Sequence, residues 1–261
     1  MAVPGRHERQ HHIAVAEGEV GRYVLLPGDP GRCELIAAFF DDARLVARNR
    51  EYETWTGTLD GVVVSVTSTG IGCPSASIAV EELVRAGADT FIRVGTSGAM
   101  QPHIQPGDIG IIHGAIRDEG TTRHYLPIEF PAVADIDVTR ALAEGAKISG
   151  RPVHVGVAQS KDSFYGQHEP GRMPIAGELQ RRWQAWMAGG AICSEMEAAG
   201  IFIVASCLGV RAGGIMLIMG HHDQAPMTEE ETERGSMADF LPAAIEGLRT
   251  LIESDRRRGD R

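Results

Sequence analysis

Lysine is almost absent from this 261-residue sequence: only Lys147 and Lys161 occur among the 25 basic residues, and the other 23 are arginines. The 35 acidic residues outnumber them and give a formal net charge of −10. Nucleic-acid polymers and anionic membranes are held mainly by broad basic surfaces, so this balance argues against both as partners. Any anion that the protein binds must instead meet a few placed arginines, whose planar guanidinium groups suit phosphate and carboxylate.

Cysteine clusters and long apolar runs are also missing. The four cysteines are scattered and form no CxxC or Cys/His cluster, which argues against structural zinc and a disulfide framework. They are Cys33, Cys73, Cys193 and Cys207. No stretch reaches the roughly 18 apolar residues of a membrane span, and the N-terminal segment has no apolar signal core. We therefore expect a cytoplasmic protein.

Two common nucleotide-binding motifs are incomplete. Gly70-Ile71-Gly72 begins like a GxGxxG fingerprint, but Pro74 interrupts the turn and Ser75 stands where the third glycine belongs. The next strand ends at Arg93 rather than at a ribose-binding acid, and no GxxxxGK[ST] segment occurs. Hydride transfer with a dinucleotide and NTP hydrolysis are therefore weakly supported.

Short apolar runs alternate with longer amphipathic stretches, which predicts one α/β domain over residues 1–261. We expect strands at Tyr23–Leu26, Val62–Thr67, Thr90–Val94, Ile109–His113, Val153–Ala158 and Gly213–Met219. We expect helices at Gly31–Phe40, Ser75–Ala86, Asp137–Ser149, Ile175–Ala188, Glu197–Leu208 and Thr228–Ser254. No repeat or linker divides the chain, and residues 1–11 and 255–261 are expected to fray.

Glycines follow the first three of these strands. Gly28 follows the first, Gly70 and Gly72 the second, and Gly95 and Gly98 the third. Ligands of open α/β folds bind beyond the carboxyl ends of strands, where backbone N–H groups can approach an anion. Each glycine could also serve only a tight turn. Three such loops in order favour an anion site.

Arginines accompany these loops. Arg32 follows Gly28 closely, Arg50 stands among polar residues, and Arg93 ends an apolar strand three residues before Thr96. A buried arginine must meet an anion, because leaving it unpaired would cost several kcal/mol, on the order of magnitude. That anion could be an internal carboxylate or a bound phosphate, to which Thr96 and glycine N–H groups would also donate.

An acidic pair, Glu195 and Glu197, flanks Met196 at the start of an expected helix. Acids at a helix N-terminus are favoured by the helix dipole, so capping alone could explain them. The alternative is a carboxylate that accepts hydrogen bonds from the two hydroxyls of a sugar, with Met196 packed on the sugar face.

The sequence resembles the nucleoside phosphorylases, and within that family the uridine phosphorylases most. The resemblance runs from about His12 to Glu253 and depends on several blocks in the same order. These blocks are Leu26–Arg32, Asn49–Trp55, Ser68–Ser75, Ile92–Ala99, Glu129–Asp135 and Ser194–Ala199. The resemblance implies a single-domain, three-layer α/β fold whose central sheet is mixed, mostly parallel and flanked by helices.

Matching positions imply roles for individual residues. Phosphate would be bound by Gly28, Arg32, Arg93 and Thr96, with Arg50 supplied across a dimer interface. Glu197 would hold the ribose hydroxyls with Met196 and Glu195, and His12 (or His11, one register earlier) would reach a neighbour's 5′-hydroxyl. A monovalent cation, potassium, would sit near Glu51, Ile71 and Ser75 at the interface, and no other cofactor is implied.

Base recognition is where the sequence departs from the family. Phe164 and Gln167 match base-contacting positions, but Glu169 stands where the uridine enzymes have an arginine, so Arg172 would have to replace it. A second family arginine is replaced around His221, which becomes a candidate for base binding and catalysis. Asp223 lies near, but not at, the position of an acid that purine enzymes use.

The implied activity is that of a pentosyltransferase which converts a pyrimidine nucleoside and phosphate reversibly to the free base and ribose 1-phosphate. Uridine is the expected substrate, in pyrimidine salvage, and the enzyme is expected to be at least a dimer and to form a hexamer. A purine or modified base, a hydrolytic nucleosidase of the same fold, and a non-catalytic nucleoside-binding protein are the alternatives.

Overall fold

A computed structural model describes residue 5 and residues 8–259. Its strands are β1 Tyr23–Leu26, β2 Asp41–Asn49, β3 Tyr52–Leu59, β4 Val62–Thr67, β5 Thr90–Ala99, β6 Ile109–Asp118, β7 Ala132–Val133, β8 Val153–Lys161, β9 Cys193–Glu195 and β10 Arg211–Ile218. Its α-helices are α1 Gly31–Ala37, α2 Cys73–Arg85, α3 Ile136–Ala146, α4 Phe164–His168, α5 Ala176–Ala188, α6 Ala198–Leu208, α7 Glu229–Arg234 and α8 Met237–Arg258.

The strands form one mixed sheet in the order β10-β6-β8-β9-β5-β1-β4-β3-β2, and the short strand β7 pairs with β6 outside this order. Its centre is parallel, since β1 pairs in parallel with both β4 and β5, and β5 does so with β10. The β10–β5 pairing brings the sheet back on itself, so that β5, β9, β8, β6 and β10 form a closed ring. The parallel centre places the carboxyl ends of β1, β4 and β5 at the same edge of the sheet.

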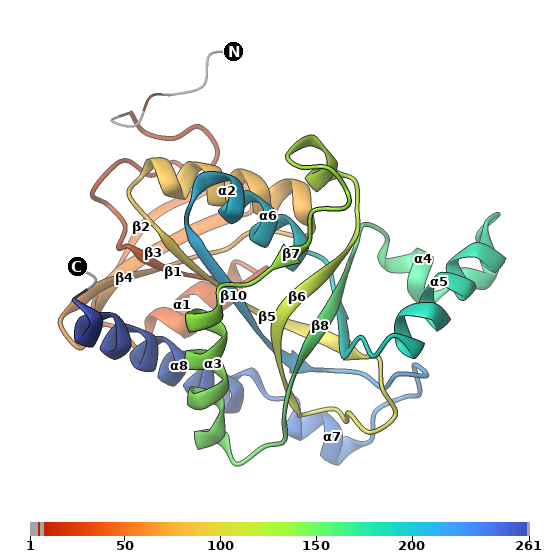
Figure 1. Cartoon of the computed structure of the whole chain (residues 1–261). Coiled ribbons are helices and arrows are strands. Elements are labelled where there is room, and N and C mark those ends of the chain that lie inside the picture. The colour runs from red at the N-terminus through yellow and green to blue at the C-terminus, as the bar shows by residue number, and fades with distance from the viewer. Residues whose placement is uncertain (1–4, 6–7, 260–261) are drawn as a thin grey trace.

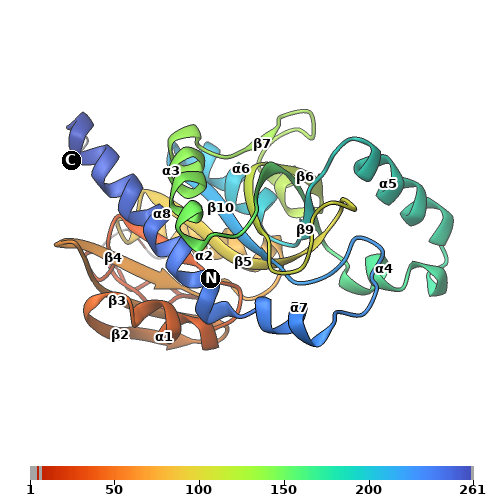
Figure 2. The same cartoon turned by 90° about the horizontal axis from the view of Figure 1, so that it is seen from below.

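Helices cover both faces of the sheet (Figures 1 and 2). The pair α2 and α6 lies on one face, and α1, α3 and α8 lie on the other. Strand β1 shows why: Val24 and Leu26 pack into the core under α2 and α6, while Tyr23 and Leu25 pack into the opposite core. Alternate side chains of a strand point to opposite faces, so a wholly apolar strand needs cover on both. The predicted three-layer α/β fold is confirmed.

The expected helices are present, although α1 and α3 end three residues earlier than expected and the last stretch differs most. The stretch Thr228–Ser254 forms two helices, because Gly235 and Ser236 separate α7 from α8. Helix α8 then continues to Arg258, beyond the point where the tail was expected to fray. Asp255 is buried there and accepts hydrogen bonds from Tyr23 and Arg211, which fixes this last turn against the sheet. In the N-terminal stretch that was expected to fray, Gln10 is also buried. Residues 1–4, 6, 7, 260 and 261 of the two expected tails lie outside the described part of the chain.

The hairpin β2–β3 was not predicted, because the exposed strand β2 carries charged residues and lacks a clear apolar alternation. Helices α4 and α5 extend from the body of the molecule beside β8 (Figure 1).

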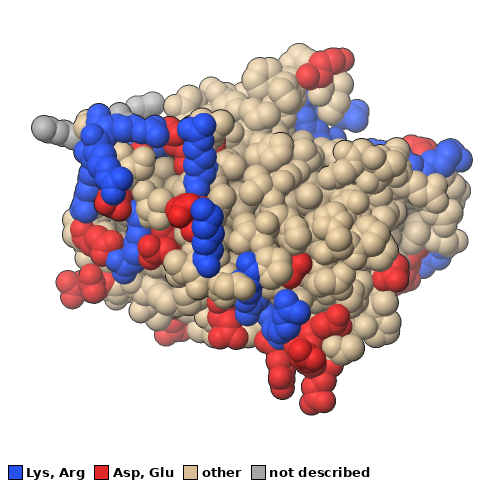
Figure 3. Space-filling model, turned by 60° about the horizontal axis from the view of Figure 1, so that its bottom comes forward, with Lys and Arg blue, Asp and Glu red and all other residues tan. Residues whose placement is uncertain are grey.

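On the face shown in Figure 3, basic and acidic side chains are interspersed and uncharged residues cover much of the centre. Within the described residues, no helix is long and apolar enough to cross a membrane.

Candidate active site

A cavity of about 890 Å³ opens at the carboxyl ends of β1 and β4, along β5 and at the start of α6. This is the sheet edge at which the glycine loops predicted an anion site. The predicted phosphate and ribose residues that line it are Gly28, Arg32, Arg93, Thr96, Glu195, Met196 and Glu197. Residues far apart in the sequence therefore meet in one place.

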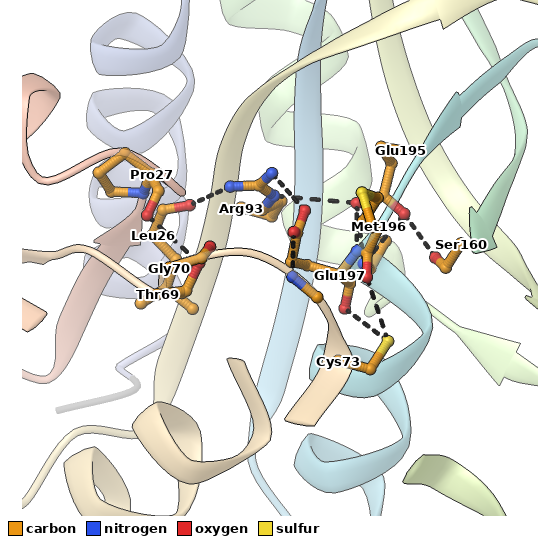
Figure 4. Close-up of polar contacts among 12 residues, drawn as sticks. Leu26, Pro27, Thr69, Gly70, Cys73, Arg93, Ser160, Glu195, Met196 and Glu197 are labelled. Carbon is orange, nitrogen blue, oxygen red and sulfur yellow. Dashed lines mark hydrogen bonds and ion pairs between the residues drawn. The ribbon is translucent and has the colours of Figure 1, made fainter. Parts of the chain in front are cut away.

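Arg93 stands at the centre of the cavity wall and is only 5% exposed. Its Nη2 donates to Glu197 Oε2 at 2.5 Å, and its Nη1 makes a longer bond of 3.3 Å to the Leu26 carbonyl (Figure 4). Its Nε lies 3.8 Å from Glu195 Oε2 and has no hydrogen-bond partner within the described chain. The internal salt bridge is thus present, yet this guanidinium keeps donor capacity beside the cavity.

Two glycines leave the space that Arg93 occupies. A Cβ on Gly95 would stand 2.9 Å from Cζ of Arg93, and one on Gly28 would stand 3.3 Å from its Nη1. Strand β5 continues to Ala99, so Gly95 and Gly98 lie within a strand and not in the loop expected after residue 94. The missing side chain of Gly95 therefore makes room for the arginine and does not serve a turn.

Arg32 lies in the first turn of α1, lines the same cavity as Arg93 and is half-buried. Burial lowers the pKa of the Arg32 guanidinium, Asp29 opposes this, and the charge of Arg93 lowers the pKa further. The two guanidinium groups are therefore close enough to repel each other. An anion placed between them would relieve that repulsion, and Thr96 lines the same cavity.

The two acids of the Glu195–Glu197 segment do different things. Glu195 accepts the backbone N–H groups of Glu197 and Ala198 and the hydroxyl of Ser160, so its carboxylate caps α6 (Figure 4). Burial, followed by the charge of Glu197, raises the pKa of the Glu195 carboxyl. The capping alternative considered from the sequence therefore describes Glu195.

Glu197 bridges two walls of the cavity. Its Oε1 accepts the Gly72 N–H at 2.6 Å, while its Oε2 pairs with Arg93. Met196 lies between the two acids, half-buried and on the cavity wall. A carboxylate tied to the arginine on one side and open to the cavity on the other can accept hydrogen bonds from ligand hydroxyls.

The far side of the cavity is formed by Phe164 and His168 of α4, with Lys161 and Ser194 beside them. Lys161 is 5% exposed, and its Nζ donates to Ser194 Oγ at 2.8 Å. Burial lowers the pKa of the Lys161 ammonium, although the charges of Glu195 and Glu197 oppose this. Ser194 Oγ also lies 2.8 Å from Gln167 Oε1, which places the predicted base residue Gln167 just behind this wall.

Arg50 and His12 do not line the cavity of their own chain. Arg50 is exposed at the turn between β2 and β3, where its φ is +55°. His12 Nδ1 lies 2.6 Å from Glu82 Oε1, and Glu82 also accepts the N–H groups of His12 and Ile13. The His12 side chain is thus held by Glu82, the Arg50 side chain is exposed, and neither lines the cavity that their predicted roles concern.

Two predicted base residues are also placed elsewhere. Arg172 is exposed, pairs with Glu169 at 2.6 Å and lies over the Tyr165 ring. His221 Nε2 lies 3.1 Å from Glu231 of α7, and His221 is absent from the described cavity walls, where its neighbours Met219 and Gly220 are found. Neither side chain contacts the cavity, because each is engaged by a nearby acid. Arg172 and Glu169 are three residues apart in the chain, whereas the His221–Glu231 pair joins residues ten positions apart.

The predicted cation residues do lie together at the cavity rim. Ser75 Oγ lies 2.9 Å from Glu51 Oε1 and 2.5 Å from the Thr69 carbonyl oxygen, and Ile71, between Thr69 and Ser75 in the chain, is 76% exposed. Carboxylate, hydroxyl and carbonyl oxygens are ligands that hard cations accept. Among the described residues, no group of three or more His, Cys, Asp or Glu side chains could hold a metal.

Lys161 and His168 were not among the predicted site residues. Lys161 ends the buried strand β8, and it is one of only two lysines in the chain. The sequence offered two signals for Lys161 as a site residue: lysine is rare in this chain, and Lys161 is a charged residue at the end of a strand. His168 is recognisable only in three dimensions, where its ring lies 4.2 Å from that of Phe164.

The family model of the phosphorylase superfamily matches residues 22–254. The chain belongs to this superfamily. It is 46% identical over 246 residues to a uridine phosphorylase of Treponema pallidum, covering 94% of this chain and 95% of that one. It is 40% identical to the uridine phosphorylase of Escherichia coli, covering 92% and 97%. A guanosine phosphorylase of Halorubrum lacusprofundi is 41% identical over 213 residues, covering 82% and 84%.

Proposed function

We propose that this protein catalyses the reversible phosphorolysis of uridine to uracil and ribose 1-phosphate. The observation that carries the proposal is the Arg93–Glu197 pair, which joins a cluster of anion-binding groups to a carboxylate in one cavity. The full-length similarity to proteins named uridine phosphorylase supports uridine as the substrate.

Phosphate would lie between Arg32 and Arg93, near Thr96, where two cations and a hydroxyl meet. Charge-assisted hydrogen bonds would fix its orientation beneath C1′ of the ribose, which replaces a bimolecular encounter with a near-attack geometry. As the bond between C1′ and the base lengthens, positive charge develops on the sugar. The phosphate dianion would stabilise that charge electrostatically.

Glu197 would accept hydrogen bonds from the ribose hydroxyls, with Met196 packed on the sugar. Because Glu197 also pairs with Arg93, the ribose and phosphate would be held in a fixed relation. Glu195 would act indirectly, by capping α6 and thereby positioning the backbone of Glu197.

The base would lie between Phe164 and the wall formed by Lys161 and Ser194. The departing base carries the electron pair of the broken bond and is an anion until it is protonated. Lys161 has donor protons beyond the one it gives to Ser194, and a buried ammonium stabilises such an anion strongly. We assign this role to Lys161 in place of Arg172 and His221.

Arg50 and His12 would act on the cavity of a neighbouring subunit, which fits their positions outside their own cavity. The active form would then be at least a dimer, and we propose a hexamer built from such dimers. No organic cofactor is required by this chemistry. A potassium ion held by Glu51, Ser75 and the Ile71 carbonyl would neutralise charge at the interface. We also propose that the enzyme acts in the cytoplasm, in pyrimidine salvage.

The test is an assay of uracil release from uridine with and without phosphate. Phosphate-dependent release together with formation of ribose 1-phosphate is the expected result. Release at the same rate without phosphate would identify a hydrolase instead. Binding of intact uridine with no turnover would identify a non-catalytic nucleoside-binding protein.

A further inference from the structure

Four polar side chains are neighbours across three strands, at the cavity wall that Lys161 and Ser194 form. Asp118 ends β6, Gln159 and Lys161 lie near the end of β8, and Ser194 lies on β9. Asp118 is the register partner of Lys161, and Gln159 is the register partner of Ser194. Residues in register, and residues two apart on one strand, share a face of the sheet, so all four side chains lie on the same face.

The two charges in this group are not paired as their register predicts. Opposite charges in register on neighbouring strands normally attract each other directly. Here Asp118 Oδ2 accepts the Gln159 side-chain N–H at 2.7 Å, and Asp118 Oδ1 pairs with Arg182 of α5. Lys161 Nζ donates to Ser194 Oγ at 2.8 Å, and within the described chain it forms no ion pair with Asp118. Gln159 therefore lies between the acid and the ammonium.

The hydrogen bonds that join Asp118 to Lys161 all run in one direction. A carboxylate only accepts, so the Gln159 amide must turn its nitrogen to Asp118 and its oxygen to Ser194. Ser194 Oγ lies 2.7 Å from that oxygen and donates its single proton there, which leaves its lone pairs for Lys161. Gln167 Oε1 lies 2.8 Å from the same hydroxyl, but Gln159 is the acceptor that Asp118 holds in place. Hydrogen bonds arranged head to tail polarise one another, so the Asp118 charge strengthens the bond to the ammonium.

Several charged groups face the Lys161 ammonium. Burial lowers the pKa of Lys161, and four acidic groups raise it: Glu195, Glu197, Cys193 and Asp118. His168 of α4 also faces Lys161, and the pKa of its imidazole is lowered by burial and then by the charge of Lys161. The ammonium is thus kept charged by acids that offset its burial, and one of them acts from β6.

Asp118 has a neighbouring acid that can serve as its control. Burial raises the pKa of the Asp118 carboxyl, the Gln159 hydrogen bond and the Arg182 charge lower it, and the Asp162 charge raises it. Both acids line a smaller cavity of about 260 Å³ beside α5. Asp162 accepts the Gly120 N–H at 2.9 Å and lies outside the hydrogen bonds that lead to Lys161.

Lys161 lines both this smaller cavity and the active-site cavity, so its position between them matters. We infer that Asp118 and Gln159 are positioning residues for Lys161: the Asp118 charge, relayed through Gln159 and Ser194, keeps the ammonium charged at the active-site wall, and Gln159 prevents it from pairing with Asp118 directly. This inference rests on the proposed function, in which Lys161 donates to the departing base. Without Gln159, Lys161 would reach the acid that is its register partner and leave the active-site wall.

The scarcity of lysine makes Lys161 directly observable. Lysine labelled with carbon-13 at Cε gives NMR signals from Lys147 and Lys161 alone, and Lys147→Arg assigns them. In Asp118→Asn, whose amide oxygen still accepts the Gln159 N–H, the titration midpoint of Lys161 should fall by about one pH unit. The alkaline decline of uridine turnover should move with it, and Asp162→Asn should move neither. An unmoved midpoint in Asp118→Asn, or an equal shift in Asp162→Asn, overturns the inference.

Gln159→Leu tests the separation of the two charges. At neutral pH, kcat/KM for uridine should fall about 10-fold, because Lys161 turns to Asp118, and the Lys161 midpoint should rise. Adding Asp118→Asn should restore most of the lost kcat/KM, since it removes the carboxylate that draws Lys161 away. A merely structural role for Gln159 would leave the double variant at least as impaired as Gln159→Leu, and that result overturns the inference. If Gln159→Leu does not fold, the midpoint in Asp118→Asn decides.

The NMR titration separates this inference from the proposed function. If uridine is not consumed, the proposed function fails, and the Lys161 midpoints alone decide the inference. Midpoints that fall in Asp118→Asn and rise in Gln159→Leu then support it. Phosphate-dependent turnover of uridine with unmoved midpoints overturns the inference and leaves the proposed function intact.

Discussion

Two arginine–carboxylate pairs, each with a buried carboxylate, lie at opposite ends of the parallel sheet, and they differ in how completely their hydrogen-bonding groups are satisfied. Near the start of β10, Arg211 donates to both oxygens of Asp255 at 2.9 and 2.6 Å and also to Thr90, and the Tyr23 hydroxyl donates to the same carboxylate. On β5, Arg93 has one short bond to Glu197, one long bond, and an Nε without a hydrogen-bond partner in the described chain.

The difference separates structural stabilisation from binding. Asp255 is 1% exposed, and both of its carboxylate oxygens accept hydrogen bonds from neighbouring side chains. The Arg93 pair borders a cavity of about 890 Å³, and the Nε of Arg93 has no hydrogen-bond partner in the described chain. A buried charge that costs free energy to desolvate and is left incompletely paired marks a site prepared for an anion.

Substituting Arg93 tests this comparison with the largest expected effect. Arg93→Met should reduce kcat/KM for phosphorolysis by about 1,000-fold, because it removes a donor that faces the reacting phosphate. The change in unfolding free energy should be smaller than that for Arg211→Met, since water in the cavity can hydrate Glu197. Steady-state kinetics measure kcat/KM and thermal unfolding measures stability. The comparison would be reversed if Arg93→Met lost more stability than Arg211→Met and kept the wild-type kcat/KM.

The same substitution at the other pair should have the opposite consequences. Arg211→Met should lower the unfolding free energy by roughly 3 kcal/mol, because it leaves the buried Asp255 carboxylate without its cation. Turnover per folded molecule should stay close to that of the wild type. Denaturant titration with activity assays checks this, and a large loss of turnover in the folded variant would contradict it.

The pH dependence of Arg211→Met sharpens the same point. Burial raises the pKa of Asp255, but hydrogen bonds from Arg211 and Tyr23 outweigh it and hold the pKa below its usual value. The resulting stability is present above the unfolded-state pKa of about 4 and is lost as the pH falls through the lower folded-state value. The difference in unfolding free energy between the wild type and Arg211→Met should therefore become smaller as the pH falls below about 4.

Lys161 offers a third comparison, with Lys147 as its control. Lys161→Met should lower kcat/KM for uridine by about 100-fold, since it removes the donor to the departing base. Lys147→Met, at an exposed helix end beside Glu144, should have no effect.

Because burial lowers the pKa of Lys161, wild-type activity should decline at a pH below the usual lysine range. In Lys161→Arg that decline should move to higher pH, and an unmoved decline would assign it to another group.

The smallest effect is expected at Arg50. Arg50→Ala should raise the KM for phosphate about 10-fold, the loss of roughly 1.4 kcal/mol from one charge-assisted contact. Mixing this variant with Arg32→Ala after subunit exchange tests whether the arginine acts across an interface. Hybrid dimers would contain one site with both substitutions and one with neither, so part of the activity should return. No recovery in verified hybrids would place both arginines in the same subunit.

The candidate site could be predicted in part because several of its residues follow or end apolar runs of the sequence. Arg32 follows β1, and Arg93 and Thr96 lie within β5 beside the carboxyl end of β1, at the edge to which a parallel sheet brings such ends. The base side could not be predicted in the same way. Arg172 and His221 are engaged by Glu169 and Glu231, and Lys161 enters from the end of β8.

The sequence by itself determined the α/β class, the two-sided burial of the strands and the few arginines available to an anion, because periodicity and charge are local properties of the chain. Only the tertiary structure decided which charged side chains have hydrogen-bond partners for all their polar atoms and which do not. Arg93 and Arg211 both occupy apolar strands with acids far away in the sequence. Pairing across such distances depends on how the sheet closes between β5 and β10, where α6 begins and where α8 ends, and no local pattern encodes that geometry.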